Sequence, residues 1–432
     1  MSNTITSVAS RLRPLLLLLA LGLAPVGAWA QGGITPNRVD GYGVPATPTS
    51  TNTSHAPGET EVNILTSYYE QDGIHGAVQG GRGTEKLTDI TPTIILNIPL
   101  DTASLFSANI GADFYASAST DRIDGVEGLY LSTPSSHDTR YHADLGYTRQ
   151  NTAKRRTVGF GGGASKEYDY LSLNVAGSWA QTSRDGNREF SAAGQVFFDK
   201  AKLIYPVELR TGQQLVPTDR RQSYNLSLVL SQVLTQRLQV ALSTELVYQH
   251  GLLSTSFHRV YFRDAPNLVR VEQLPQNRIK YPVGLRLSYY ATDLVQLRAY
   301  YRYYQDNFDI RAHTLELETP LKLTPFFVLY PFYRYHTQTA AHYFAPYAQH
   351  LATDVFYTSD YDLSSFSANK YGLGLRYSPV YGLGRFKTPF HHAQGARKVA
   401  KFKALDVRYA HYQRSNNFTA NIISADLSFT MP

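Results

Sequence analysis

The chain has 432 residues, of which 43% are hydrophobic, 12% aromatic and only 17% charged, and its formal net charge is +7. It has no Cys, which excludes disulfides, thiolate metal sites and a cysteine nucleophile. Soluble domains carry about 25% charged residues. The low charge, the 32 Tyr residues and a slightly negative mean hydropathy together argue against a bundle of membrane helices and favour a β-barrel that spans a membrane.

Residues 1–30 have the pattern of a secretory signal peptide. Arg11 and Arg13 precede the apolar run 15–23, and Ala28-Trp29-Ala30 offers a cleavage site between small residues. The apolar run is shorter than the roughly 20 residues that a spanning helix needs, so we favour a signal peptide over a membrane anchor. Residues 31–60 are rich in Gly, Pro, Thr, Ser and Asn, and we predict a short flexible, disordered periplasmic tail.

Residues 61–432 break into segments in which apolar and polar residues alternate. In one of them Leu171, Leu173 and Val175 share a face, while Ser172 and Asn174 lie on the other. Soluble strands average about 5–6 residues, whereas spanning strands need about 9–11. We therefore predict one all-β domain, a transmembrane antiparallel β-barrel of about 16 strands (range about 14–18). The predicted strands are 61–70, 88–99, 104–117, 137–149, 154–166, 168–182, 188–199, 223–234, 237–249, 280–291, 294–305, 308–318, 325–337, 368–378, 402–413 and 418–431.

The connections between these segments alternate in length. Short turns are expected at 99–103, 150–153, 235–236 and 291–293, and long excursions at 71–87, 118–136, 200–222, 250–279 and 338–367. Short periplasmic turns opposite long external loops are typical of barrels in the outer membrane of Gram-negative bacteria, where the apolar face contacts lipid. The last segment, 427–432, resembles the terminal strand that the barrel assembly machinery recognises, although Pro432 departs from that pattern.

Three runs in the N-terminal third resemble an uncharacterised outer-membrane family, catalogued as a domain of unknown function and common in Bacteroidota and some proteobacteria. The runs are Tyr68-Tyr69-Glu70-Gln71-Asp72-Gly73, Gly83-Thr84-Glu85-Lys86-Leu87-Thr88-Asp89 and the stretch from Gly111 to Asp124. The resemblance implies a barrel in the cell envelope and implies no activity.

The first candidate site is the barrel lumen. The polar faces of the predicted strands carry Arg286, Arg298, Arg302, Arg376 and Arg408, together with Glu245 and Asp426. A basic lumen attracts anions, whereas arginines paired with lumenal carboxylates only brace the wall. We expect a channel or transport protein for small hydrophilic solutes with a mild preference for anions. The alternative is a non-conducting binding or scaffold barrel, with ligand- or metal-binding external loops and a Tyr-rich surface at Tyr343, Tyr347, Tyr357 and Tyr361.

The second candidate is an acidic cluster on the first two external connections. It includes Glu70, Asp72, His75, Asp121 and Asp124. Oxygen-rich loops coordinate Ca²⁺, and His with carboxylates suits a transition metal. None of these residues has EF-hand or His-Glu-x-x-His spacing. Carboxylates that cap turns and pair with arginines are therefore the alternative, and no cofactor is expected.

The third candidate is the basic run 385–403. It holds Arg385, Lys387, Arg397, Lys398, Lys401 and Lys403 beside His391 and His392, with no acidic residue. The strand order places it on the periplasmic side, where it could meet anionic headgroups or a periplasmic partner. A solvated basic loop is the alternative, and nucleic acid is not expected in this compartment.

No catalytic signature is present, and we expect no enzyme activity. The sequence lacks Gly-x-Ser-x-Gly, the motif that would place a serine nucleophile. The glycines at 159 and 161–163 precede no predicted helix, so they do not form a phosphate loop. We expect them to relieve crowding within a strand.

Overall fold

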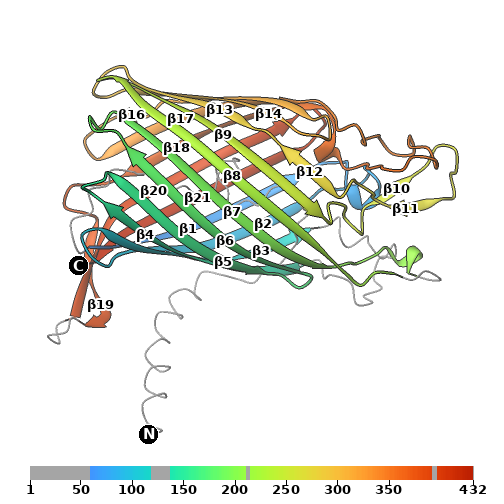
Figure 1. Cartoon of the computed structure of the whole chain (residues 1–432), viewed down its shortest axis with the longest axis horizontal. Helices are drawn as coiled ribbons and strands as arrows, with labels where there is room; N and C mark the ends of the chain where they lie inside the picture. Colours follow the sequence, from blue (N-terminus) through green and yellow to red (C-terminus); the bar gives the residue numbers. More distant parts are fainter. Residues whose placement is uncertain (1–58, 118–136, 211–214, 392–396, 432) are drawn as a thin grey trace, which may run out of the picture.

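The computed structural model describes residues 59–117, 137–210, 215–391 and 397–431. The predicted signal peptide and almost all of the predicted tail lie outside the described residues. The described chain folds as a closed antiparallel barrel of sixteen strands (Figure 1). No helix in this part of the chain is long and apolar enough to cross a bilayer.

The wall follows the chain from strand to neighbouring strand. Its first half comprises β1 (Thr60–Asp72), β2 (Leu87–Pro99), β3 (Ser104–Ser117), β4 (His137–Asn151), β5 (Arg156–Lys166), β6 (Tyr170–Thr182), β7 (Arg188–Lys202) and β8 (Thr218–Thr235). Its second half comprises β9 (Leu238–Gly251), β12 (Asn277–Lys280) with β13 (Val283–Tyr290), β14 (Gln296–Gln305), β15 (Arg311–Glu318) with β16 (Leu321–Lys322), β17 (Phe327–Gln338), β18 (Phe366–Tyr377), β20 (Arg397–Arg414) and β21 (Thr419–Met431).

Two of the sixteen strands are interrupted at a proline. Pro282 separates β12 from β13, which both pair with β9, and Pro320 separates β15 from β16, which both pair with β17. Proline has no N–H to donate to the ladder, so each strand is interrupted over two residues, the second of which is the proline. All sixteen predicted segments coincide with wall strands.

The barrel closes where the first wall strand meets the last. β1 and β21 pair without a break from Thr60 opposite Met431 to Asp72 opposite Thr419. Closure is required because the bilayer core offers no hydrogen-bond partner to an unpaired strand edge.

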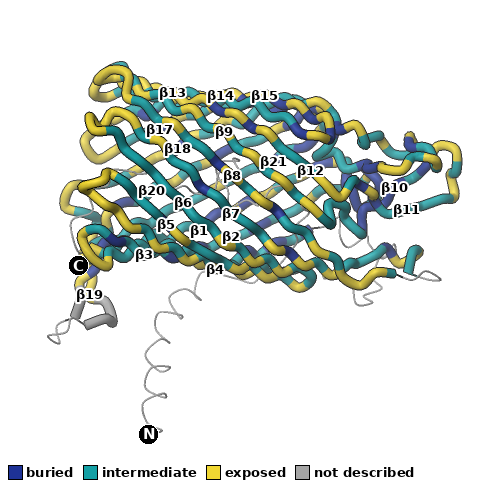
Figure 2. Tube along the Cα trace, viewed as in Figure 1, coloured by how far each residue is buried: buried dark blue, intermediate teal, exposed yellow. Residues whose placement is uncertain are grey.

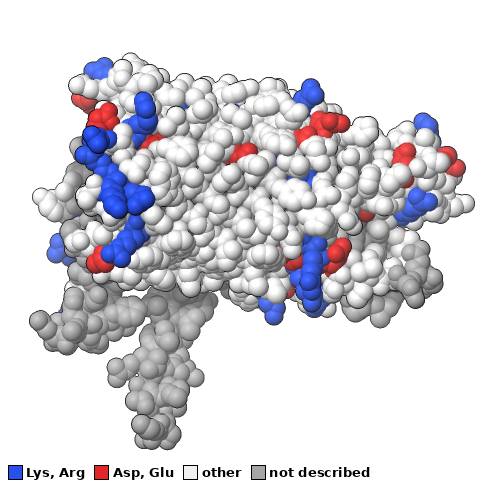
Figure 3. Space-filling view, in the orientation of Figure 1, with Lys and Arg blue, Asp and Glu red and all other residues white. Residues whose placement is uncertain are grey.

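The outward face of the wall is apolar. One cross-strand row runs through Leu242, Leu285, Tyr301, Leu315 and Tyr335, all more than a third exposed. In Figure 3 the charged side chains gather towards the two ends of the barrel, and the surface between them is largely uncharged. This belt matches the lipid-facing band of an outer-membrane barrel.

The two ends of the barrel differ. Short turns and the ends of β1 and β21 lie at one end, which we call the terminal end, whereas the long loops lie at the other, the loop end (Figure 1). The loop end carries the hairpin β10 (Arg259–Tyr261) and β11 (Val269–Val271) and the 3-10 turns η1 (Ala77–Gln79), η3 (Val207–Leu209) and η4 (Tyr361–Leu363). Buried residues gather near β10 and β11 (Figure 2). The length asymmetry assigns the terminal end to the periplasm.

Candidate functional site: the lumen wall and the external cap

All seven predicted lumen residues lie on the inward face of the wall. Many of their neighbours along the strands, such as Leu285, Tyr301 and Val407, are exposed on the outward face. This follows from strand geometry, because side chains alternate between the two faces. Whether these residues contact a solute stays a prediction.

Glu318 on β15 holds two of the predicted arginines. The Arg298 guanidinium lies 2.7 Å from Glu318 Oε1, and the Arg408 guanidinium lies 3.5 Å from Glu318 Oε2. Arg408 also lies 4.9 Å above the Tyr330 ring. These two arginines therefore brace the wall, because their charge is partly balanced by one shared carboxylate.

Two carboxylates and an arginine follow one another around the wall nearby. Arg376 lies opposite Asp406 in the register of β18 and β20, and Asp406 lies opposite Asp426 in the register of β20 and β21. Tyr330 donates a hydrogen bond to Asp406. The Oδ1 atom of Asp426 is buried without a hydrogen-bond partner, so this part of the wall holds an acidic charge that is only partly compensated.

Arg286 and Arg302 extend over tyrosine rings on the same inward face. Arg286 lies 5.3 Å from the Tyr300 ring centroid, and Arg302 lies 5.8 Å from that of Tyr304. Glu245 on β9 projects to the same side of the wall. Cation–π contacts orient a guanidinium without neutralising its charge.

The lumen is water-accessible towards the terminal end. Arg286, Arg298 and Arg376 point inward and are nevertheless exposed. An inward side chain is exposed where the barrel interior, or its open end, leaves space for water.

The lumen is filled towards the loop end. The inward residues Tyr69, Tyr115, Arg414 and Phe418 are each less than a tenth exposed. The two halves of the lumen therefore differ in accessibility.

Four loops pack together over the loop end and form what we call the external cap. They are residues 73–86, 203–217 apart from the undescribed 211–214, 252–276 and 339–365. One apolar centre of the cap contains Val260, Phe262 and Tyr357. Another is formed by Leu274 with Phe308 of the turn between β14 and β15. A loop region with its own apolar centres has a defined fold.

Arg259 joins three of these loops. Its Nε and Nη2 atoms donate to the Glu208 carboxylate at 2.6 and 3.0 Å, and Nη1 donates to the carbonyl of Val78 at 3.0 Å. Arg259 is only 5% exposed. A bidentate carboxylate pair of this kind fixes geometry as well as charge.

The cap is attached to the inner wall. Arg414 on β20 forms a 2.5 Å ion pair with Asp362 in loop 339–365, and its guanidinium lies against the rings of Phe366 and Phe418. Gln71 on β1 donates a 2.8 Å hydrogen bond to the carbonyl of Glu85 in loop 73–86. The cap is therefore bound to inward-facing residues.

The predicted Tyr-rich surface is largely used within the cap. Tyr343 packs against Phe308, Tyr357 packs against Phe262, and Tyr347 lies under the guanidinium of Arg82. These three tyrosines therefore contact other residues of the protein, and so does Tyr361, whose ring stacks on that of His75.

The predicted acidic metal cluster is dispersed among separate partners where it is described. Glu70 lies on the outward face, and Asp72 pairs with Lys86 at 3.8 Å. The His75 ring stacks on Tyr361 at 3.7 Å. Asp121 and Asp124 lie outside the described residues. Within the described part of the chain, these groups do not converge on one point.

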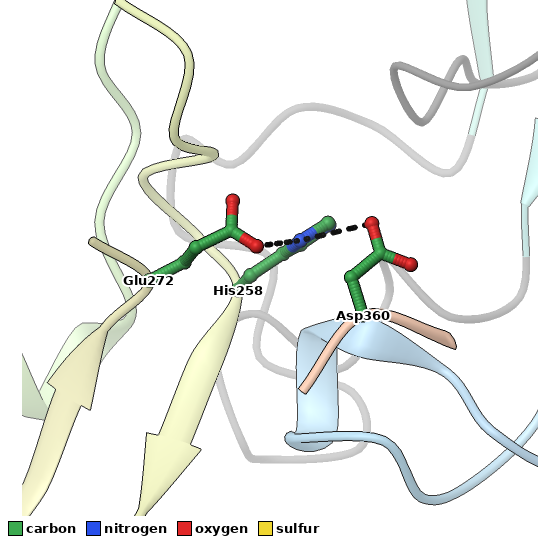
Figure 4. A group of neighbouring side chains, drawn as sticks. All are labelled: His258, Glu272 and Asp360. Carbon is green, nitrogen blue, oxygen red and sulfur yellow. Dashed lines mark ion pairs between the residues drawn. The ribbon is translucent and has the colours of Figure 1, made fainter. Parts of the chain in front are cut away.

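Two other clusters bring together residues that sequence reasoning did not select. His258, Glu272 and Asp360 meet inside the cap, and Asp138, Glu167 and Asp169 meet at the rim beside the tight β5–β6 connection. No motif could have found the first cluster, because its members come from two loops far apart in the sequence. Figure 4 shows the three side chains facing one another.

The described residues of the basic run 385–403 lie in two paired strands beyond the terminal end, where sequence reasoning expected a loop. β19 (Gly384–His391) pairs with the first part of β20. The Phe386 and Phe402 rings both pack against Phe429, which gives the paired strands an apolar contact with the last strand. Lys403 lies 3.5 Å from Glu61, and residues 392–396, with His392, lie outside the described residues.

Comparison with protein families finds one family that matches most of the chain. The family model described as "Protein of unknown function (DUF3570)" matches residues 44–387. No curated protein matches the sequence significantly.

Similar solved structures share little sequence with the chain. A bacterial polysaccharide outer membrane secretin is 10% identical with a TM-score of 0.42, covering 86% of this chain and 97% of its own. A BenF-like porin from Pseudomonas fluorescens is 9% identical with a TM-score of 0.41, covering 87% and 99%. The siderophore receptor PirA from Acinetobacter baumannii is 10% identical with a TM-score of 0.42, covering 83% and 60%.

Proposed function

We propose that this chain, which belongs to the family of proteins of unknown function DUF3570, is an outer-membrane channel for small hydrophilic solutes with a mild preference for anions. The observation that carries the proposal is the exposure of the inward-facing Arg286, Arg298 and Arg376. Arg298 and Arg376 lie near the rim, and Arg286 lies four residues inside the end of β13, where a packed barrel would leave no water beside its guanidinium group.

The anion preference rests on a difference among the inward arginines. Arg298 and Arg408 share the Glu318 carboxylate, so their field in the lumen is reduced. Arg286 lies over a neutral tyrosine ring, which leaves its positive charge available to an anion. Because Asp406 and Asp426 supply negative charge nearby, we expect weak rather than strict selectivity.

The external cap limits the channel. It is tied to the inner wall by the Arg414–Asp362 ion pair and is held together by Arg259. A solute entering from the loop end must pass beside the cap or wait for it to move. We therefore expect small or interrupted conductance rather than that of a wide pore.

Planar-bilayer conductance of the purified protein, with the reversal potential measured under a KCl gradient, tests the proposal. We expect discrete conductance steps and a reversal potential displaced towards the chloride equilibrium value. A correctly folded, heat-modifiable barrel that never conducts would exclude the channel, and a cation-selective one would exclude the anion preference.

A binding or scaffold barrel is the second candidate. It is favoured by the packed apolar centres of the cap, which give the loops the fixed shape that a ligand-binding surface requires. This second function would be favoured if neither the wild type nor a variant without the Arg414–Asp362 ion pair conducts. Neither proposal includes a catalytic step.

A further inference from the structure

The external cap contains a buried histidine between two carboxylates. His258 immediately precedes β10, Glu272 immediately follows β11, and Asp360 precedes η4 (Figure 4). The Nδ1 atom of His258 lies 3.9 Å from Glu272 Oε1 and 3.9 Å from Asp360 Oδ2. The His258 side chain is 4% exposed.

The imidazole lacks the partners that a buried ring normally has. Neither Nδ1 nor Nε2 of His258 has a hydrogen-bond partner. Buried polar atoms are almost always hydrogen-bonded, because an unpaired one has lost its bonds to water without replacement. Nδ1 is directed between two carboxylates that lie too far away to accept a hydrogen bond from it.

The spacing is suited to an ion between the three groups. One ligand atom from each residue lies within 4.8 Å of the other two. A metal ion bound at about 2.0–2.2 Å separates its ligand atoms by roughly 3.3–4.4 Å, depending on the bond angle. The two measured separations of 3.9 Å fall within this range.

Both carboxylates are held in place by hydrogen bonds from neighbouring groups. Glu272 Oε2 accepts a hydrogen bond from the Thr255 N–H at 2.7 Å. Oε1, the oxygen that faces His258, accepts one from the Thr358 hydroxyl at 2.5 Å and keeps a second lone pair for an ion. Asp360 Oδ1 accepts from the Asp362 N–H at 2.9 Å, which leaves Oδ2 facing His258. Supporting hydrogen bonds of this kind orient the ligands of metal sites.

We propose that His258, Glu272 and Asp360 bind one divalent transition-metal ion of the Zn²⁺ class, with water in the remaining coordination positions. One imidazole with two carboxylates suits such an ion, whereas Ca²⁺ takes six to eight oxygen ligands. The bound ion joins loop 252–276 to loop 339–365 and so fixes the shape of the cap. This proposal stands whether or not the barrel conducts.

Metal binding to the full-length barrel in detergent tests the proposal. After treatment with EDTA, the protein is titrated with Zn²⁺ by calorimetry, and its metal content is measured after dialysis. We expect one Zn²⁺ per chain and binding of Ca²⁺ at least about tenfold weaker. Failure to retain Zn²⁺, or equal affinity for Ca²⁺, would overturn the assignment.

Two variants and one control locate the ion. His258→Gln and Asp360→Asn should each weaken Zn²⁺ binding by about tenfold or more, whereas His342→Gln, at an exposed histidine of the same cap loop, should leave it unchanged. Undiminished binding in both ligand variants would overturn the proposal in favour of a protonated His258 held between the carboxylates. If a ligand variant does not fold, the wild-type protein is digested with a protease with and without Zn²⁺. Protection of the cap by Zn²⁺ would support the metal site, because the ion-pair alternative predicts no such protection, and absence of protection would overturn it.

Discussion

The Asn174 side chain on β6 donates a 3.0 Å hydrogen bond to the Asp144 carboxylate on β4, although β5 runs between their strands. Gly163 on β5 lies opposite both residues in the register. A Cβ atom at Gly163 would lie 1.9 Å from the Asp144 Oδ1 atom and 2.8 Å from the Asn174 Nδ2 atom. The missing side chain therefore allows two polar groups of alternate strands to meet on the lumen face.

Gly163→Ala should break this cross-strand hydrogen bond and destabilise the barrel by about 1–2 kcal/mol. The Asp144 carboxylate can rotate away, so we expect the barrel to fold with a lower urea midpoint. Gly194→Ala on β7 is the control, because the nearest atom to its added Cβ would be 3.9 Å away. Equal midpoints for the two variants would contradict the role assigned to Gly163.

Arg286→Gln should shift the selectivity of the channel towards cations. The substitution removes an exposed inward positive charge, and we expect the chloride-to-potassium permeability ratio to fall by about twofold. Reversal potentials under a KCl gradient measure the change. Arg237→Gln removes the same charge in the exposed turn between β8 and β9 and should have little effect. If both variants shift the ratio equally, Arg286 has no special position in the ion path.

Asp362→Asn should loosen the cap by weakening its ion pair with Arg414. The Arg414 side chain is 3% exposed, so its charge would lose its buried partner. We expect open events to become roughly tenfold more frequent, equivalent to about 1.4 kcal/mol. Single-channel recording measures this frequency, and Asp309→Asn at an exposed loop position is the control. An unchanged open frequency would mean that the cap does not limit conduction.

Glu167, in the tight β5–β6 connection, should make stability depend on pH. Burial raises the pKa of its carboxyl from 4.5 to about 7, and the carboxylates of Asp169 and Asp138 act in the same direction, although the Tyr115 hydroxyl and Arg140 oppose the shift. The folded protein therefore retains a proton between about pH 4.5 and 7 that the unfolded chain has released. Stability should fall as pH rises through this interval and level off above it.

Glu167→Gln tests this dependence, because Gln keeps an acceptor for the Tyr115 hydroxyl and carries no charge. We expect the variant to exceed the wild type by about 2 kcal/mol at pH 8 and to differ little at pH 4.5. Urea midpoints at the two pH values give the comparison. Glu70→Gln on the outward face near the same rim should not reproduce the gain.

Strand alternation predicts the barrel because the two faces of each strand meet different solvents. The lipid-facing row through Leu285, Tyr301 and Leu315 and the inward position of Arg298 both follow from a period of two. Alternation does not predict where a ladder breaks, and the interruptions depend on Pro282 and Pro320. It also missed β10 and β19, because strands outside the wall are stabilised by local tertiary packing.

The candidate sites also differ in how far the sequence predicts them. Lumen residues are predictable, since a position on a wall strand determines the face. Cap residues are not, because the contact between His258 and Asp360 depends on how two long loops pack. The same limitation explains why Glu70, Asp72 and His75, although near one another in sequence, have separate partners in the structure.

The pairing of β1 with β21 has a consequence for how the protein reaches the membrane. The contacts of this seam join the two ends of the described chain, so they carry the largest loop-closure entropy of any strand pair in the wall. Until they form, two strand edges are unsatisfied and incompatible with lipid. Folding and insertion should therefore occur together as one late, slow step, and extraction should begin by reopening the same seam.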